Sequence, residues 1–97
     1  MNGTQARWRV QCFGQVQRVG FRDTARRLAR RQGLTGWAEN RPDGSVVLEA
    51  QGGISQLRSF FMQLKSQPHL HIEKADISIL PIQSYERGFQ VRSSGRD

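Results

Sequence analysis

The residues best suited to chemistry lie at positions 14 to 22, which read Gly-Gln-Val-Gln-Arg-Val-Gly-Phe-Arg. This polar, glycine-flanked segment leaves an alternating strand and leads to an arginine in the first turn of a predicted helix. Backbone N–H groups in such a loop converge without partners, and the helix N-terminus adds partial positive charge. An arginine can donate two parallel hydrogen bonds to phosphate oxygens. The segment therefore predicts an anion site centred on Arg22.

The polar residues of this region also have a structural interpretation. An arginine at a helix start commonly pairs with surface carboxylates. Asn40 stands just ahead of Arg41-Pro42, and asparagine is common where a chain turns. Gly14 and Gly20 suit turns or close packing. The preceding loop favours the anion interpretation for Arg22, whereas the residues alone favour a turn for Asn40.

Other groupings of reactive side chains are weak. His69 and His71 flank Leu70, but a metal ion needs further ligands and none is evident nearby. No Ser/His/Asp set and no pair of carboxylates is arranged for acid and base work. We therefore expect no metal, no cofactor and no covalent mechanism.

The length of 97 residues suits one compact domain, residues 1–97, with one hydrophobic core. The net charge of +7 comes mostly from arginine and should attract phosphorylated metabolites, nucleic acid or acidic lipid headgroups. A run of arginines on one predicted helix usually forms a solvated face. The run comprises Arg26, Arg27, Arg30 and Arg31. Charge alone does not choose among these partners.

Signals for targeting and cross-linking are sparse. There is no charged-then-apolar leader and no apolar run of membrane-spanning length, so we expect a cytoplasmic protein that does not enter a membrane. Cys12 is the single cysteine, which excludes an internal disulfide and a multi-thiolate metal site. The lack of an evident spare apolar face favours a monomer.

Hydrophobic periodicity predicts the elements around the loop. Residues 7–13 alternate as in a half-buried strand. One face holds Trp8, Val10 and Cys12, and the other holds Arg7, Arg9 and Gln11. Residues 23–32 carry strong helix formers and a narrow stripe of small apolar side chains, and Gly33 stops this helix. The small side chains suggest close packing on a sheet.

Later segments continue the alternation of strands and helices. Leu34–Asn40 and Ser45–Gln51 flank Arg41-Pro42-Asp43-Gly44, which suits a type I hairpin turn. A second amphipathic helix ends before Gln67-Pro68. Its apolar positions are Ile54, Leu57, Phe60, Phe61 and Leu64. Residues 72–80 alternate again, and residues 89–91 suit a short edge strand.

The predicted order is therefore βαββαβ with a short extra C-terminal strand. A helix joins the first strand to the second and the third to the fourth, so each of these pairs runs parallel, whereas the hairpin is antiparallel. Splitting both parallel pairs gives an antiparallel sheet with two helices on one face, the ferredoxin-like α/β (α+β) two-layer sandwich. Many functions use this fold, so function must be argued from the site.

Three ordered segments resemble the acylphosphatase family. They are Val16-Gln17-Arg18-Val19-Gly20-Phe21-Arg22, Gly33-Leu34-Thr35-Gly36-Trp37-Ala38-Glu39-Asn40 and Asp43-Gly44-Ser45-Val46. The resemblance extends to Glu49–Gly52 and to the finish Gly88-Phe89-Gln90-Val91-Arg92, so it spans nearly the whole chain. A glycine-rich loop alone is weak evidence, but this ordered set is specific.

The resemblance implies hydrolysis of a small-molecule acyl phosphate to a carboxylate and inorganic phosphate, without a metal or a covalent intermediate. Arg22 would bind the phosphoryl oxygens together with the amides of residues 15–19, and Asn40 would orient the attacking water. An amide donates and accepts hydrogen bonds but is a poor base, which suits a good leaving group. The implied substrate-binding loop is Gly14, Gln15, Val16, Gln17, Arg18 and Val19.

Arg18 departs from the family, which usually has glycine at this position of the loop. If the position requires a positive φ, a residue other than glycine costs roughly 1–3 kcal/mol there. The side chain would equally add a second cation near the phosphate. Replacing it with glycine is therefore expected to raise stability or activity.

Two other functions occur on the same fold. RNA-recognition domains are also βαββαβ and basic, but residues 45–50, Ser-Val-Val-Leu-Glu-Ala, lack their stacking aromatics. Acylphosphatase-like modules also begin larger carbamoyl-transferring maturation proteins, whose zinc-finger cysteines are missing here. We therefore expect a stand-alone enzyme. The alternatives are a non-catalytic anion-binding or RNA-binding module and a fragment of such a maturation protein.

Overall fold

The elements follow the predicted order along the chain. The computed structural model describes residues 4–93. Its strands and helices are β1 (Gln5–Gln15), α1 (Phe21–Arg31), β2 (Thr35–Asn40), β3 (Val46–Gly53), α2 (Ile54–Lys65), β4 (His71–Leu80) and β5 (Phe89–Arg92). Every predicted segment is present, and the boundaries move by no more than about two residues, the usual uncertainty of helix and strand ends.

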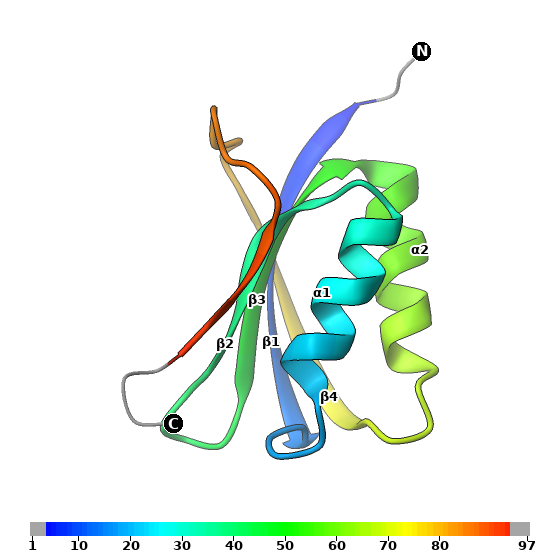
Figure 1. Ribbon diagram of the computed structural model, residues 1–97, viewed down its shortest axis with the longest axis vertical. Coiled ribbons are helices and arrows are strands. Elements are labelled where there is room, and N and C mark those ends of the chain that lie inside the picture. Colours follow the sequence, from blue (N-terminus) through cyan, green and yellow to red (C-terminus); the bar gives the residue numbers. More distant parts are fainter. Residues whose placement is uncertain (1–3, 94–97) are drawn as a thin grey trace.

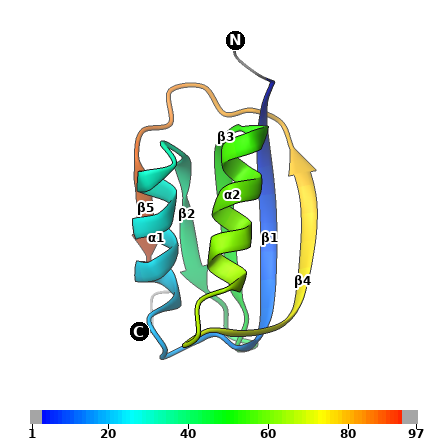
Figure 2. The ribbon, with the colours of Figure 1, turned by 90° about the vertical axis from the view of Figure 1, so that its right-hand side faces the viewer.

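The five strands form one sheet with both helices on one face (Figure 1, Figure 2). The strand order is β4-β1-β3-β2-β5. The pairs β1–β3, β1–β4 and β2–β3 are antiparallel, which confirms the ferredoxin-like prediction. β5 pairs parallel with β2, so the complete sheet is mixed rather than antiparallel throughout. The connection of residues 81–88 passes over one end of the sheet and returns the chain in the direction of β2 (Figure 2).

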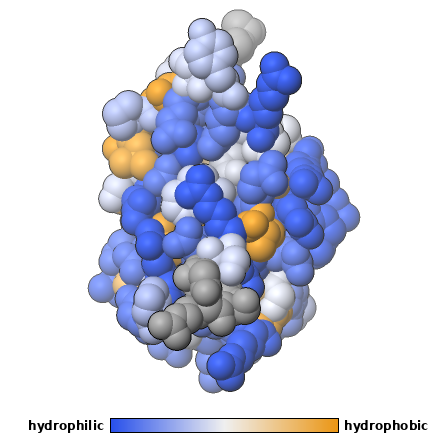
Figure 3. Space-filling model, turned by 60° about the vertical axis from the view of Figure 1, so that its left-hand side comes forward, coloured by the Kyte–Doolittle hydropathy of each residue, from blue (hydrophilic) through white to orange (hydrophobic). Residues whose placement is uncertain are grey.

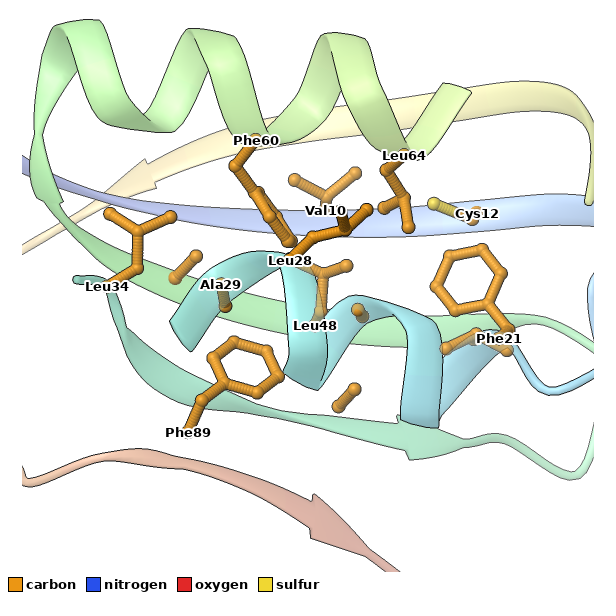
Figure 4. Packing of buried hydrophobic residues seen from close by; sticks show 14 of the residues in the cluster. Val10, Cys12, Phe21, Leu28, Ala29, Leu34, Leu48, Phe60, Leu64 and Phe89 are labelled. Carbon is orange, nitrogen blue, oxygen red and sulfur yellow. The ribbon is translucent and has the colours of Figure 1, made fainter. Parts of the chain in front are cut away.

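The hydrophobic core lies between the helices and the sheet (Figure 4). Its large, fully buried side chains include Val10, Cys12, Leu48, Phe60, Leu64 and Phe89. On α1 the small residues Ala25 and Ala29 are fully buried, so this helix can lie close to the strands beneath it, as the sequence predicts. Burial raises the pKa of the Cys12 thiol to about 12.

The β2–β3 hairpin and the β1–α1 loop lie at the same end of the sheet (Figure 1, Figure 2). The predicted turn is confirmed, because the Gly44 N–H donates to the Arg41 carbonyl at 3.1 Å. Asp43 Oδ1 accepts hydrogen bonds from the backbone N–H of Ser45 at 2.9 Å and from its hydroxyl at 2.6 Å. These bonds make the hairpin tip a fixed neighbour for the loop.

Arg7 corrects the prediction that β1 is only half buried. Its side chain is 0 % exposed, because the 81–88 connection folds over the sheet face that the helices leave open. The Arg7 Nε donates to Glu49 Oε1 at 2.8 Å, and the two Nη atoms donate to Glu86 at 2.8 and 3.1 Å. Periodicity identifies the face on which a strand residue lies, but it does not show what covers that face.

The network around Arg7 ties the 81–88 connection to the sheet. Gln51 Nε2 donates to the Gln83 carbonyl at 2.9 Å, and its Oε1 accepts from the Gln83 N–H at 2.8 Å. Burial raises the pKa of Glu86, but hydrogen bonding and positive charge, chiefly from Arg7 with smaller contributions from Thr35 and Arg92, outweigh this effect and leave that pKa below its ordinary value. The connection that delivers β5 is therefore held by a charged cluster.

β4 keeps its alternation but is incompletely covered. Ile77 and Ile79 pair with Val10 and Trp8 of β1, yet they are 47 % and 77 % exposed. β4 is an edge strand that lies outside the helix α2 in Figure 2, so the helices do not reach these side chains.

Within the described residues no helix is long and apolar enough to cross a bilayer.

Candidate active site

Residues 16–20 form the loop between β1 and α1. Among residues 4–93, the backbone N–H groups of this loop donate no hydrogen bond to another backbone group. Arg18 and Gly20 have φ values of 64° and 81°, and Val19 between them has a negative φ. Left-handed residues in a loop can turn successive N–H groups toward one side, as in anion-binding nests. These features are compatible with the predicted anion cradle, the name used below for the loop of residues 16–20.

Helix α1 begins directly after this cradle. Gly20 is its N-cap residue, and the first helical hydrogen bond runs from the Thr24 N–H to the Gly20 carbonyl at 3.0 Å. The N–H groups of the first turn are thus directed toward the loop, where the helix dipole favours negative charge.

A small pocket of about 100 Å³ lies over the cradle. It is lined by Val16, Arg18, Gly20, Phe21, Arg22, Asp23, Asn40 and Val91. The structure thus brings Arg22 and Asn40 to one pocket, although they come from different elements. Small-molecule pockets commonly measure roughly 300–1,000 Å³, so this one has room for a phosphoryl group and little more.

Arg22 is half-buried at the start of α1, and β5 holds its guanidinium. Its Nη1 donates to the backbone carbonyl of Arg92 at 2.9 Å, and Val91 of the same strand forms part of the pocket wall. The adjacent Asp23 is bound by Arg26, with 2.9 Å between Oδ1 and Nη2. The short edge strand was predicted, but its contribution to the site was missed, because only the parallel pairing with β2 places it beside α1.

Asn40 is the last residue of β2 and pairs with Val46 of β3. Gln17 connects this hairpin to the loop, since its Nε2 donates to the carbonyls of Arg41 at 2.8 Å and Ser45 at 2.9 Å. The two carbonyls belong to the residues on either side of the turn that follows Asn40. The Gln17 side chain therefore ties the hairpin turn that follows Asn40 to the loop, a contact that the sequence alone does not indicate.

The other predicted loop residues lie outside the pocket lining. Gly14 and Gln15 belong to β1 and pair with Ile72 and His71 of β4. Gly14 has a φ of 126°, and a Cβ there would overlap the backbone carbonyl of His71, so glycine is required for strand packing at this bulge. Val19 packs partly against the core.

The histidines singled out in the sequence have no common ligand. His69 shares a 3.1 Å hydrogen bond between its Nε2 and the Thr24 hydroxyl. Over the described part of the chain, no group of three or more His, Cys, Asp or Glu side chains is arranged to hold a metal ion.

The sheet face opposite the helices offers little stacking surface for bases. The Arg92 guanidinium lies 4.2 Å from the centre of the Trp37 ring, and Lys74 Nζ lies 5.4 Å from the centre of the Phe13 ring. Figure 3 shows mainly hydrophilic residues on this side, with separate small apolar areas. A nucleic-acid platform would present aromatic rings that other side chains leave uncovered.

Comparisons with known proteins agree with this geometry. The acylphosphatase family model matches residues 8–91. The acylphosphatase of Polaromonas naphthalenivorans is 45% identical over 75 residues, which are 76% of this chain and 74% of that protein. The acylphosphatase of Salinibacter ruber is 40% identical over 91 residues, which are 93% of this chain and 96% of that protein.

Solved structures give the same relationship. The Bacillus subtilis acylphosphatase superposes with a TM-score of 0.84 at 28% identity, covering 90% of this chain and 98% of that chain. HypF from T. kodakarensis superposes with a TM-score of 0.79 at 28% identity, covering 94% of this chain but 12% of that chain. With the family model matched over most of its length and relatives of similar length, the chain belongs to the acylphosphatase family.

Proposed function

We propose that the pocket of Arg22 and Asn40 hydrolyses acyl phosphates. Water attacks the phosphorus, the bond between phosphorus and the acyl oxygen breaks, and the carboxylate leaves with the bonding electrons. The water supplies the new oxygen of inorganic phosphate, and its proton passes to a phosphoryl oxygen of the substrate. One observation carries this proposal: the cradle of unpaired loop N–H groups lies in one small pocket with a catalytic-type arginine and an amide side chain.

The cradle and Arg22 would stabilise the charge of the phosphoryl group. Backbone N–H groups and the α1 dipole are fixed before the substrate arrives, so they cost no reorganisation in the transition state. The hydrogen bond from Arg22 to the Arg92 carbonyl anchors one edge of the guanidinium against β5. Phosphoryl transfer depends mainly on positioning and charge stabilisation, which is what this pocket supplies.

Asn40 would hold the attacking water in line with the leaving carboxylate. Its amide can donate one hydrogen bond and accept another but removes a proton poorly. That capacity is sufficient because an acyl phosphate has a good leaving group, so position matters more than basicity. Gln17 acts as a positioning residue by holding the Arg41 and Ser45 carbonyls beside Asn40.

The test is hydrolysis of benzoyl phosphate with excess chelator, comparing the wild type with Arg22→Ala and Asn40→Ala. Arg22→Ala removes two charge-assisted hydrogen bonds of roughly 1.5–3 kcal/mol each, so we expect turnover to fall on the order of 10² to 10⁴-fold. Arg27→Ala on the exposed side of α1 is the matched control and should retain activity. A folded wild type that binds phosphate without turnover would refute the enzymatic proposal in favour of an anion-binding module.

We also propose that residues 1–97 act as a single-domain monomer in the cytoplasm. The buried, unbridged thiol of Cys12 agrees with this compartment, because cytosolic thiols are kept reduced. Coverage of 96% of the Salinibacter ruber relative supports a stand-alone enzyme, while the likeness to 12% of T. kodakarensis HypF keeps a module of a larger protein as the second candidate. Light scattering of the purified chain tests the monomer. Turnover of benzoyl phosphate by that chain alone supports the stand-alone enzyme, and inactivity would favour the module.

A further inference from the structure

Arg18 is the unusual residue of the pocket. It lines the same cavity as Arg22 and Asn40, and it has a φ of 64° that an arginine adopts only at some cost. Arg22 is half-buried and bonded to β5, whereas Arg18 is exposed. Within residues 4–93 the Arg18 side chain has no hydrogen-bond or ion-pair partner. The pocket therefore carries a second cation that the fold itself does not use.

The size of the pocket separates the parts of a bound acyl phosphate. A cavity of about 100 Å³ that takes the phosphoryl group leaves the acyl group outside, at the mouth. Both arginines line the pocket, and the exposed Arg18 is more accessible from solvent than the half-buried Arg22. A cation at the mouth acts on whatever charge the acyl group carries.

Charges around the mouth do not neutralise Arg18. Asp23 is the carboxylate among the residues that line the pocket, and it is bound by Arg26 at 2.9 Å. On the hairpin side, Glu39 faces Arg41 at 3.3 Å. The Asp43 carboxylate accepts both hydrogen bonds of Ser45. The carboxylates described around the pocket are therefore paired with groups other than Arg18.

We propose that Arg18 recognises a second anionic group on the acyl part of the substrate. The preferred substrates are then acyl phosphates of diacids, with a carboxylate or a further phosphate beyond the reacting carbonyl, rather than those of uncharged acids. The inference rests on the proposed acyl phosphate hydrolysis and adds its substrate class. Arg18 is in this sense a specificity residue of the mouth.

The test compares succinyl phosphate with butyryl phosphate, which have the same number of carbons but differ in a terminal carboxylate. In the wild type at low salt we expect kcat/KM to be about tenfold higher for succinyl phosphate, the effect of one charge-assisted hydrogen bond. The preference should shrink as KCl approaches about 1 M, because salt screens exposed charges. Succinate itself should inhibit hydrolysis by the wild type only weakly, since it lacks the phosphoryl group.

Variants locate the effect at Arg18. Arg18→Gln should bring the ratio of the two kcat/KM values close to one, and Arg18→Lys should keep most of it. Arg58→Gln removes one exposed positive charge from α2, outside the pocket lining, and should leave the ratio unchanged. Melting temperatures confirm that each variant is folded, and the salt series on the wild type tests the same proposal without any substitution.

The outcomes separate this inference from the proposed function. Absence of turnover with both substrates would refute the hydrolase itself. Turnover of both with equal kcat/KM, or a preference that survives in Arg18→Gln, would overturn the role of Arg18 and leave the hydrolase standing. Equal losses on both substrates in Arg18→Gln would place the side chain on the phosphoryl group and would likewise overturn the diacid preference.

Discussion

Two arginines at opposite ends of the sheet illustrate how partners decide the role of a charge. Arg7 is completely buried, and its donors are taken by Glu49, Gln51 and Glu86. Arg22 is half-buried beside a loop whose backbone N–H groups have no backbone acceptor in the described chain. The first arrangement satisfies its own donors, while the second gathers donors around the small pocket. Backbone donors without backbone acceptors, rather than positive charge itself, therefore support the proposed anion site.

The largest effect is expected at Arg7. Arg7→Met should lower the free energy of unfolding by roughly 3–5 kcal/mol, because it leaves Glu86 without its partner and Glu49 with Arg9 alone. Urea unfolding measures this change, and kcat of the folded protein should stay near the wild-type value. A loss of activity at unchanged stability would contradict the division between the two arginines.

Arg22→Lys should have nearly the opposite effects on stability and activity. Lysine keeps the charge but not the planar pair of donors, so we expect turnover to fall roughly 10² to 10³-fold with little change in stability. Steady-state hydrolysis of benzoyl phosphate and a thermal melt give the two quantities. Normal turnover in this variant would show that charge suffices and that two-donor geometry is unnecessary.

Gln17→Leu tests whether the hairpin must be held to the cradle. Both hydrogen bonds of Gln17 are lost while its backbone N–H remains, so we expect kcat to fall about tenfold, with inhibition by inorganic phosphate nearly unchanged. In the Asn40→Ala background, Gln17→Leu should lower kcat little further, because the Asn40 side chain that Gln17 would position is already absent. Additive losses in the double variant would argue against a role through Asn40.

Arg18→Gly should stabilise the protein slightly. The positive φ of this position suits glycine, so relief of strain should outweigh the greater freedom of the unfolded chain and add about 1 kcal/mol. Arg58→Gly in helix α2 is the control and should instead destabilise by about 1 kcal/mol. Denaturant midpoints of the two variants should therefore move in opposite directions.

Acid should weaken the Arg7 cluster, because Glu86 becomes protonated as the pH falls. The folded pKa of Glu86 lies below its ordinary value of 4.5, so the folded state binds fewer protons at this group than the unfolded state does. Its contribution is present above pH 4.5 and is lost as pH falls through the folded pKa. Glu86→Gln should flatten the pH dependence of unfolding below pH 4.5, and an unchanged curve would contradict this assignment.

Much of the fold follows from local patterns. The alternation of residues 7–13, the apolar stripe from Ile54 to Leu64 and the Arg41–Gly44 turn each predict an element that the structure contains. Arg22 could be assigned to an anion loop from its neighbours alone. Asn40 could not, because its place in the pocket depends on hairpin pairing and on Gln17.

Features that arise from distant contacts were not predictable in the same way. The burial of Arg7 depends on a connection about 80 residues away in sequence, and the pocket wall at Val91 depends on the parallel pairing of β5. Neither contact leaves a periodic signal in the segments that make it. Local composition describes each surface, and only the assembled chain shows which surfaces meet.

The buried Cys12 gives the folded protein its own reporter of opening. A thiol with 0 % exposure and a pKa of about 12 holds almost no thiolate at neutral pH, so oxidants and alkylating reagents have neither access nor a nucleophile to react with. Once the core opens, the same thiol reacts as an ordinary one. The rate at which Cys12 is labelled therefore measures how often the sandwich opens, and no cysteine has to be introduced for this purpose.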